Sequence, residues 1–314
     1  MQVAYLFSGQ GAERAGMGAE FYQHNLQFKQ AFDQASQILE LDLPQLCFTA
    51  DSRLQTTEYA QPALVALNWA LYQASQAQLP PANALLGLSL GEYGALLAGG
   101  QLTLNDGLML VKARGHLMAQ ACQQQAGEMV VVLKASAAQI EAACVAGQQQ
   151  GAVMVANYNS PQQVVLGGTT AGIAAAVAYL RAQGVKRILP LPVSGAFHTP
   201  LMQSAATAFT PYLAQCCFSA GELPVWSNTT CTPFTAATLA TTLAQQMVQP
   251  THFAACIKVL VQQGVDTFIE FGPAPVLARL VKQTAPHAQV YQVADPESLT
   301  NTVTELEVAH GITR

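Results

Sequence analysis

The stretch Gly87-Leu88-Ser89-Leu90-Gly91-Glu92 (GLSLGE) follows the apolar run PANALL and leads into YGALLAGG. The apolar run predicts a buried strand, and the segment after it predicts a helix over about 90–99. A serine between two glycines at a strand-to-helix turn has two interpretations. It is either the nucleophile of a G-x-S-x-G elbow or part of an ordinary tight turn.

The elbow interpretation gives each residue of the turn a physical task. The two glycines would let backbone segments approach where a Cβ would clash. The sharp turn would lift Ser89 Oγ out of the sheet and point the Leu90 N–H, at the helix start, toward a developing oxyanion. Because a strand is predicted before Ser89 and a helix after it, as in an elbow, we favour the interpretation that Ser89 is a nucleophile over that of an ordinary turn.

Strands and helices alternate along most of the chain, for example the helix predicted at 21–39, which indicates an α/β domain with a mainly parallel sheet. The middle of the chain differs, because residues 126–194 read as β-α-β-β-α-β, the ferredoxin-like pattern. We therefore predict a large catalytic subdomain from residues 1–125 and 195–314, with a small subdomain inserted at 126–194. A chain of 314 residues can supply a core for each.

The composition argues against several classes of function. The net charge is -5, so no general basic surface for nucleic acid is expected. No apolar run of 18 residues and no basic leader region appear, so we expect neither a membrane span nor a secretory signal. The seven cysteines are scattered without a C-x-x-C motif, which favours a reducing cytoplasm over a disulfide framework or a metal site.

A serine nucleophile needs a base. Among the six histidines, His198 in PVSGAFHTPLM follows a predicted strand and starts a predicted helix, although a capping or buried structural histidine is the alternative. The only aspartate between Ser89 and His198 is Asp106, which a capping pattern at 103–106 already explains. We therefore expect a dyad in which a backbone carbonyl, not a carboxylate, orients the imidazole.

Seven segments, in order and across nearly the whole chain, resemble the malonyl-CoA:acyl carrier protein transacylases of bacterial fatty acid synthesis. They are LFSGQGAERAGMG, QPALVALNWALY, GLSLGEYGALLAGG, LVKARGHLM, VANYNSPQQVVLGG, VSGAFHTPLM and FIEFGPAPVLARLV. Their combination is far more specific than G-x-S-x-G alone. The resemblance implies an α/β fold, a hydrolase-like parallel-sheet domain with an inserted ferredoxin-like small subdomain, in agreement with the order of elements above.

The resemblance also implies roles for matching residues. Ser89 would be the nucleophile and His198 the general acid and base. Gln10 would shape the oxyanion hole beside the Leu90 N–H. Gln246, in a stretch that matches less tightly, would hold His198 through its backbone carbonyl.

Three further residues would determine the acyl group. Arg114 would bind the malonyl carboxylate with two parallel hydrogen bonds, which a planar guanidinium can make and a lysine cannot; a solvated helix arginine is the alternative. Phe197 would limit branched acyl groups, or would simply pack in the core. Leu88 stands where many family members have histidine, so it cannot supply a proton and bears on the shape of the pocket.

The implied reaction is of ping-pong type. Ser89 attacks the thioester of malonyl-CoA, CoA leaves, and the phosphopantetheine thiol of holo acyl carrier protein then accepts the malonyl group. The resemblance implies no metal or other cofactor, and a cytoplasmic monomer without a nucleic-acid or membrane partner. Because the carrier proteins of these systems are acidic, a basic patch is expected, with Lys186, Arg187 and Arg181 as candidates or as a merely solvated face.

Three other functions share parts of the pattern. An acyl-thioester hydrolase would use Ser89 and His198 with water as the acceptor, but it has no use for Arg114. A non-catalytic module that binds carrier proteins would not need to keep these residues together. A transacylase of polyketide assembly or malonate decarboxylation would use the same residues, and the sequence does not separate it from fatty acid synthesis.

Overall fold

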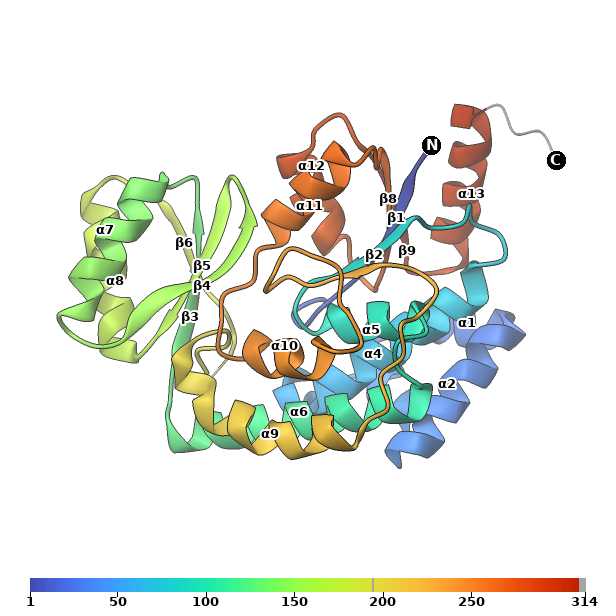
Figure 1. Ribbon diagram of the computed structural model, residues 1–314, viewed down its shortest axis with the longest axis horizontal. Coiled ribbons are helices and arrows are strands. Elements are labelled where there is room, and N and C mark those ends of the chain that lie inside the picture. Colours follow the sequence, from blue (N-terminus) through green and yellow to red (C-terminus); the bar gives the residue numbers. More distant parts are fainter. Residues whose placement is uncertain (194, 311–314) are drawn as a thin grey trace.

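The computed structural model describes residues 1–193 and 195–310, in which two sheets form the centres of two subdomains (Figure 1). The predicted boundary at 194 and the C-terminal residues 311–314 lie outside the described ranges. The α/β fold class expected from the sequence is confirmed, with one parallel and one antiparallel sheet.

The large subdomain contains a five-stranded, wholly parallel sheet in the order β7-β2-β1-β8-β9. The strands are β1 (Val3–Phe7), β2 (Ala84–Gly87), β7 (Val225–Trp226), β8 (Thr267–Phe271) and β9 (Gln289–Val293). Every residue of β1, β2 and β8 is buried, because helices cover both faces of the sheet. The carboxyl ends of parallel strands meet at one edge, where ligands bind in folds of this kind.

The two faces of this sheet belong to separate cores. Tyr5 and Phe7 of β1 pack in one core, whereas Ala4 and Leu6 pack in the other. Since side chains alternate along a strand, the unbroken apolar run VAYLF is what a strand between two helical layers requires.

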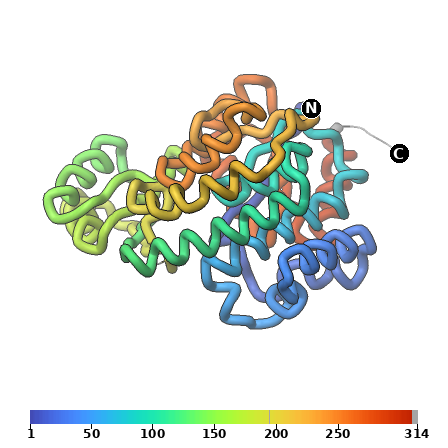
Figure 2. The backbone as a smooth tube through the Cα atoms, turned by 60° about the horizontal axis from the view of Figure 1, so that its bottom comes forward, coloured from blue at the N-terminus to red at the C-terminus, as the bar shows by residue number. Residues whose placement is uncertain are grey.

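Helices form both layers. Those of the large subdomain are α1 (Ala19–His24), α2 (Leu26–Leu39), α3 (Leu43–Phe48), α4 (Thr57–Ser75), α5 (Gly91–Ala98), α6 (Leu104–Gln124), α9 (Gln203–Gln215), α10 (Leu239–Gln246), α11 (Phe253–Gln262), α12 (Val276–Thr284) and α13 (Pro296–His310), with short 3-10 helices η1 (Ser52–Gln55) and η2 (Pro200–Met202). In Figure 1, α11 and α12 lie above the sheet, and α4, α5 and α6 lie below it. Figure 2 shows α6 and α9 running side by side.

The small subdomain follows the predicted order of elements. It consists of β3 (Glu128–Leu133), α7 (Ala137–Gln148), β4 (Val153–Ser160), β5 (Gln163–Gly168), α8 (Thr170–Ala182) and β6 (Arg187–Pro190). The strands pair antiparallel in the order β4-β5-β3-β6. All four lie within the range 126–194. The helices α7 and α8 cover one face of this sheet with apolar side chains.

The other face of the small sheet packs against residues 196–199 of the large subdomain. A Cβ added at Gly167 of β5 would lie 3.1 Å from Thr199 Cγ2 and 3.6 Å from the Ala196 Cβ. A second junction lies at the edge of β4, where Thr251 N donates to Ala156 O at 2.9 Å and Tyr158 N donates to Thr251 O at 2.8 Å. The small sheet therefore supports the segment that carries His198.

One expected helix is interrupted. The helix predicted at 21–39 is two helices, α1 and α2, which meet at Asn25. Asn25 has an extended backbone, and its Oδ1 accepts a hydrogen bond from Phe28 N at 2.9 Å. Asparagine is a favoured N-cap, so the local cap overrides the continuous apolar periodicity.

Gly87 provides a test of the crossing between β2 and α5. A Cβ at this position would lie 1.9 Å from Gly91 C and 2.1 Å from Gly91 O. We expect Gly87→Ala to lower the free energy of unfolding by about 3 kcal/mol, because the backbone must move apart. Urea denaturation measures this. Gly184→Ala is the control, since its φ of 81° is strained but no atom lies within 4 Å; it should cost about 1 kcal/mol. Equal losses would contradict the tight crossing.

Candidate active site

Ser89 stands at the turn between β2 and α5 with a strained backbone. Its φ is 54°, a left-handed conformation that is uncommon for a residue other than glycine. Asn228, which follows β7, fixes this turn: its Oδ1 accepts from Ser89 N at 2.9 Å, and its Nδ2 donates to Gly87 O at 2.8 Å. The Ser89 hydroxyl is thereby held at the carboxyl edge of the sheet, as the elbow interpretation predicted.

His198 reaches Ser89 from the segment before η2. Its Nε2 lies 2.7 Å from Ser89 Oγ, and its Nδ1 lies 2.7 Å from the Gln246 backbone oxygen. The backbone N–H of His198 donates to Met247 O at 3.1 Å, so the end of α10 holds both the ring and the chain. A carbonyl oxygen only accepts, so Nδ1 carries the proton and Nε2 faces the hydroxyl as an acceptor. This is the tautomer that a general base needs.

The electrostatics of the site keep His198 neutral at pH 7. Burial lowers its pKa to about 4, and the charge of Arg114 acts in the same direction, whereas the hydrogen bond that His198 donates to the Gln246 carbonyl opposes the shift. Asp106 takes no part in this contact. It lies at the start of α6, where its N–H donates to Thr103 Oγ1 at 3.1 Å, as the capping pattern predicted.

Arg114, in the middle of α6, lies beside the serine. Its Nη2 is 3.4 Å from Ser89 Oγ and 2.9 Å from Gln246 Oε1, and its Nη1 donates to Gln61 Oε1 at 2.8 Å. The side chain is 1% exposed, so the alternative of a solvated helix arginine is wrong. The ion pairs between described residues do not include Arg114. A buried guanidinium without a carboxylate partner can bind an anionic group next to the hydroxyl.

The two predicted oxyanion-hole residues lie near this cluster. Leu90 directly precedes α5, so its N–H is at a helix N-terminus, where backbone N–H groups lack intrahelical acceptors. Gln10 donates to Thr57 Oγ1 at 3.0 Å and accepts from Gln61 Nε2 at 3.4 Å. The second bond connects Gln10 to Gln61, which also accepts a hydrogen bond from Arg114. The oxyanion role of both residues stays a prediction.

The structure places the two predicted selectivity residues in different packing environments. Phe197 is buried in the core on the α4 and α6 side of the sheet, which agrees with the core-packing alternative. Leu88 is half-buried and packs against the core on the α11 side, which includes Trp226 and Phe253. Effects of either on acyl selectivity stay predictions.

Three residues of the site were not singled out from the sequence. Gln61, Glu92 and Asn228 are all completely buried. Both carboxyl oxygens of Glu92 accept hydrogen bonds, one from Asn228 N and one from Gln246 Nε2. Burial raises the pKa of Glu92 to about 8, although these two bonds and the charge of Arg114 oppose the rise. The sequence did offer a signal for these residues: Gln61 and Glu92 are polar residues inside apolar helices, and Asn228 follows a strand of the parallel sheet.

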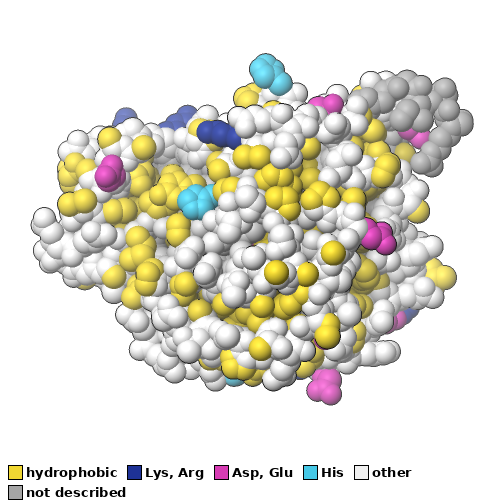
Figure 3. Space-filling model, viewed as in Figure 1, with side chains coloured by type: hydrophobic (Ala, Val, Ile, Leu, Met, Phe, Trp, Pro, Cys, Tyr) yellow, Lys and Arg dark blue, Asp and Glu magenta, His cyan; other side chains and the backbone are white. Residues whose placement is uncertain are grey.

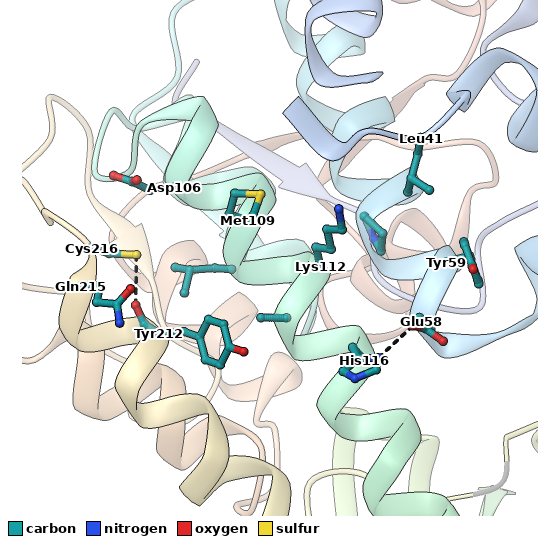
Figure 4. Close-up of a pocket in the computed structure, with 13 residues that line it drawn as sticks. Leu41, Glu58, Tyr59, Asp106, Met109, Lys112, His116, Tyr212, Gln215 and Cys216 are labelled. Carbon is teal, nitrogen blue, oxygen red and sulfur yellow. Dashed lines mark hydrogen bonds and ion pairs between the residues drawn. The ribbon is translucent and has the colours of Figure 1, made fainter. Parts of the chain in front are cut away.

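The pocket in Figure 4 is separate from this cluster. It has a volume of about 560 Å³ and lies on the outer side of α6, where Met109, Lys112 and His116 line it together with side chains of α4 and α9. Positions 112 and 116 are each two residues from Arg114, about 200° around the helix. Arg114 therefore points away from this pocket, and no predicted site residue lines it.

Within residues 1–193 and 195–310, no group of three or more His, Cys, Asp or Glu side chains is arranged to hold a metal ion. In the same ranges, every helix is too short or too polar to cross a membrane.

Residues 4–304 match the acyl transferase domain family. The chain is 36% identical, over 95% of its length and 95% of the relative, to the malonyl CoA-acyl carrier protein transacylase of Bacillus subtilis. The crystal structure of MCAT from Streptococcus pneumoniae superposes with a TM-score of 0.92 and 38% identity, over 97% of this chain and 100% of that one. A malonyl-transacylase in complex with a type II PKS acyl-carrier protein gives a TM-score of 0.93 and 31% identity, over 97% and 100%. The chain belongs to the acyl transferase domain family.

The protonation of His198 provides a test that needs no natural substrate. A serine-directed sulfonyl fluoride should modify Ser89 at a rate that requires neutral His198. Because the pKa is about 4, the rate should stay constant from pH 8 to pH 5 and fall as the pH drops through 4. Intact mass measures the modification, and circular dichroism at each pH distinguishes loss of the base from unfolding. A midpoint near 6.5 with the fold intact would contradict this assignment.

Proposed function

We propose that this acyltransferase moves a malonyl group from malonyl-CoA to the phosphopantetheine thiol of holo acyl carrier protein, through an ester on Ser89. The observation that carries the proposal is the buried Arg114 guanidinium, 3.4 Å from Ser89 Oγ. The names of the relatives described above support the choice of acyl donor and acceptor.

In the first half-reaction, His198 Nε2 takes the hydroxyl proton as Ser89 Oγ attacks the thioester carbon. The Gln246 carbonyl stabilises the imidazolium that forms, since it keeps its hydrogen bond to Nδ1–H. The negative oxygen of the tetrahedral intermediate is stabilised by the Leu90 N–H, with Gln10 nearby. His198 then protonates the sulfur of CoA as it leaves.

Arg114 determines which acyl group reacts. In malonyl-CoA, the carboxylate carbon is the third carbon counted from the CoA sulfur. The carboxylate can therefore reach the Arg114 guanidinium while the thioester carbon lies at Ser89. An acetyl group leaves the buried guanidinium without an anion. This argument favours a malonyl transferase over a simple acyl-thioester hydrolase, which gains nothing from the arginine.

In the second half-reaction, the thiol of the carrier protein attacks the malonyl ester, and His198 serves again as the base and then returns the proton to Ser89. We propose that no metal or other cofactor takes part, because Ser89, His198 and Arg114 supply the nucleophile, the base and the anion site. By the family resemblance, we further propose a monomer that acts in the cytoplasm.

The distribution of charge suggests where an acidic carrier protein approaches. Residues 129–294 contain seven Lys and Arg and only four Asp and Glu. The seven cations are exposed, and none forms an ion pair with another described residue: Lys134, Arg181, Lys186, Arg187, Lys258, Arg279 and Lys282. Figure 3 shows the larger dark-blue group at the upper left, toward the small subdomain. We propose this side for docking, with Lys186, Arg187 and Arg181 as part of it.

The pathway follows from the carrier protein that the enzyme serves. We propose that the malonyl groups are extender units for fatty acid synthesis. Polyketide assembly is the alternative, because one structural neighbour was solved with a polyketide carrier protein.

An intact-mass experiment tests the acyl intermediate. After brief exposure to malonyl-CoA, the protein should gain one malonyl group on Ser89, because the hydroxyl is already hydrogen-bonded to its base. The adduct should persist in buffer and disappear when holo acyl carrier protein is added. Ser89→Ala should gain no mass. An adduct lost equally fast in buffer would identify a hydrolase instead.

Substitution of Arg114 tests the selectivity. A charge-assisted hydrogen bond contributes roughly 1.5–3 kcal/mol, so Arg114→Ala should lower kcat/KM for malonyl-CoA about 10- to 150-fold. The acetyl-CoA rate should fall much less, and Arg114→Lys should restore only part of the malonyl rate because lysine lacks the planar fork. Steady-state kinetics with both donors measures this. Parallel losses for malonyl and acetyl would contradict the role of a carboxylate-binding residue.

A further inference from the structure

We propose that Glu92 is a positioning residue for malonyl recognition. It fixes the orientation of the Gln246 side-chain amide, and that amide in turn holds Arg114 in place to receive the carboxylate. This inference rests on the proposed function, since it concerns how the malonyl-binding arginine is aligned.

The Gln246 side-chain amide donates through its nitrogen and accepts through its oxygen. Its Nε2 donates one hydrogen bond to Ser89 O at 2.9 Å and another to a carboxyl oxygen of Glu92. Its Oε1 accepts from Arg114 Nη2 at 2.9 Å. Arginine can only donate, so this contact exists only while the amide oxygen, and not the amide nitrogen, faces α6.

Glu92 lies on α5, three residues after Ser89, and is completely buried. Its other carboxyl oxygen accepts from the backbone N–H of Asn228. A backbone N–H cannot rotate away, so one oxygen of Glu92 is committed to it and the other remains for Gln246. Glu92 therefore presents an acceptor to Gln246 Nε2, and its two hydrogen bonds connect α5, the Asn228 turn and the end of α10.

The isosteric variant Glu92→Gln reverses this arrangement without creating a cavity. The new side-chain carbonyl must pair with the Asn228 N–H, which leaves the new amide nitrogen facing Gln246. Gln246 can avoid two opposed donors only by turning its Oε1 toward position 92. Its Nε2 then faces Arg114 Nη2, donor against donor, and the guanidinium loses the partner that aligned it beside Ser89.

The sign of the effect separates this role from a simple change of charge. At a pH above 8, where Glu92 is ionised, its replacement by glutamine also removes a negative charge near Arg114, which on charge alone strengthens the attraction of Arg114 for a malonyl carboxylate. Misalignment of Arg114 has the opposite result. General damage to the fold lowers the malonyl and acetyl rates together, so the ratio of the two rates reports alignment specifically.

The experiment compares the first-turnover rate of Ser89 acylation by malonyl-CoA and by acetyl-CoA at pH 9, where Glu92 is ionised and accepts at both oxygens, followed by intact mass. The variants are Glu92→Gln, Gln246→Met and the double variant; methionine keeps the backbone carbonyl that holds His198 but removes the amide. The control is Glu270→Gln. Glu270 is also completely buried and also accepts two N–H bonds, from Leu277 and Ala278, but these lie at the start of α12.

We expect Glu92→Gln to lower the malonyl-to-acetyl rate ratio at least tenfold, with a raised KM for malonyl-CoA. Because Glu92 acts through Gln246, the double variant should have no lower a ratio than the more affected single variant. Glu270→Gln should leave the ratio unchanged. An unchanged or increased ratio in Glu92→Gln, or full additivity in the double variant, would overturn the inference.

Two further outcomes are distinguishable. If Glu92→Gln does not fold, Gln246→Met decides the question, and an undiminished ratio in that variant overturns the inference. If the unaltered protein forms no malonyl ester at all, the proposed function fails and the role of Glu92 fails with it. A normal malonyl ester in the unaltered protein, with no change of ratio in the variants, would overturn the role of Glu92 alone.

Discussion

The site depends on the close crossing of β2 and α5 at Gly87 and Gly91. No side chain fits between the two backbones, since a Cβ at Gly87 would overlap the carbonyl group of Gly91. This contact places Ser89 in a left-handed conformation at the tip of the turn and starts α5 immediately after it. The nucleophile, the helix N-terminus and the buried Glu92 one turn later are therefore all positioned by one backbone contact.

Around this crossing, the site is held by polar contacts between segments that are distant in the sequence. Gln246 contributes four of them, because its backbone carbonyl binds His198 and its side chain binds Arg114, Ser89 and Glu92. A side-chain amide is costly to bury unless each of its donors and its acceptor forms a hydrogen bond. The Gln246 amide meets this condition and connects a guanidinium, an imidazole and a carboxyl group in one buried cluster.

The sequence predicted the fold well because the pattern of each element is local. The apolar run of β1 and the β-α-β-β-α-β order of the small subdomain are readable without knowledge of contacts. Asn25 shows the limit of periodicity, since the cap that divides α1 from α2 is a single side-chain bond inside a continuous apolar pattern.

The site was predictable only in part. The elbow made Ser89 recognisable, the position of His198 after a strand and before a helix marked it as the candidate base, and the resemblance assigned Arg114; the structure brings these residues together with Gln246. The buried partners Gln61, Glu92 and Asn228 were missed, because their positions depend on the directions of side chains from separate elements. The bonds of Gln10 to Thr57 and Gln61 were unforeseen for the same reason.

The packing of residues 196–199 against the small sheet has a mechanical consequence. The segment around the base of the dyad contacts both subdomains, because Ala196 and Thr199 pack against the small sheet, whereas His198 is hydrogen-bonded to the end of α10 in the large subdomain. A relative displacement of the two sheets would therefore strain the segment 196–199, which is attached to both subdomains. The hydrogen bonds of Thr251 to β4 join the two subdomains and resist such a displacement. The alignment of the catalytic base is thus coupled to the packing between the two subdomains.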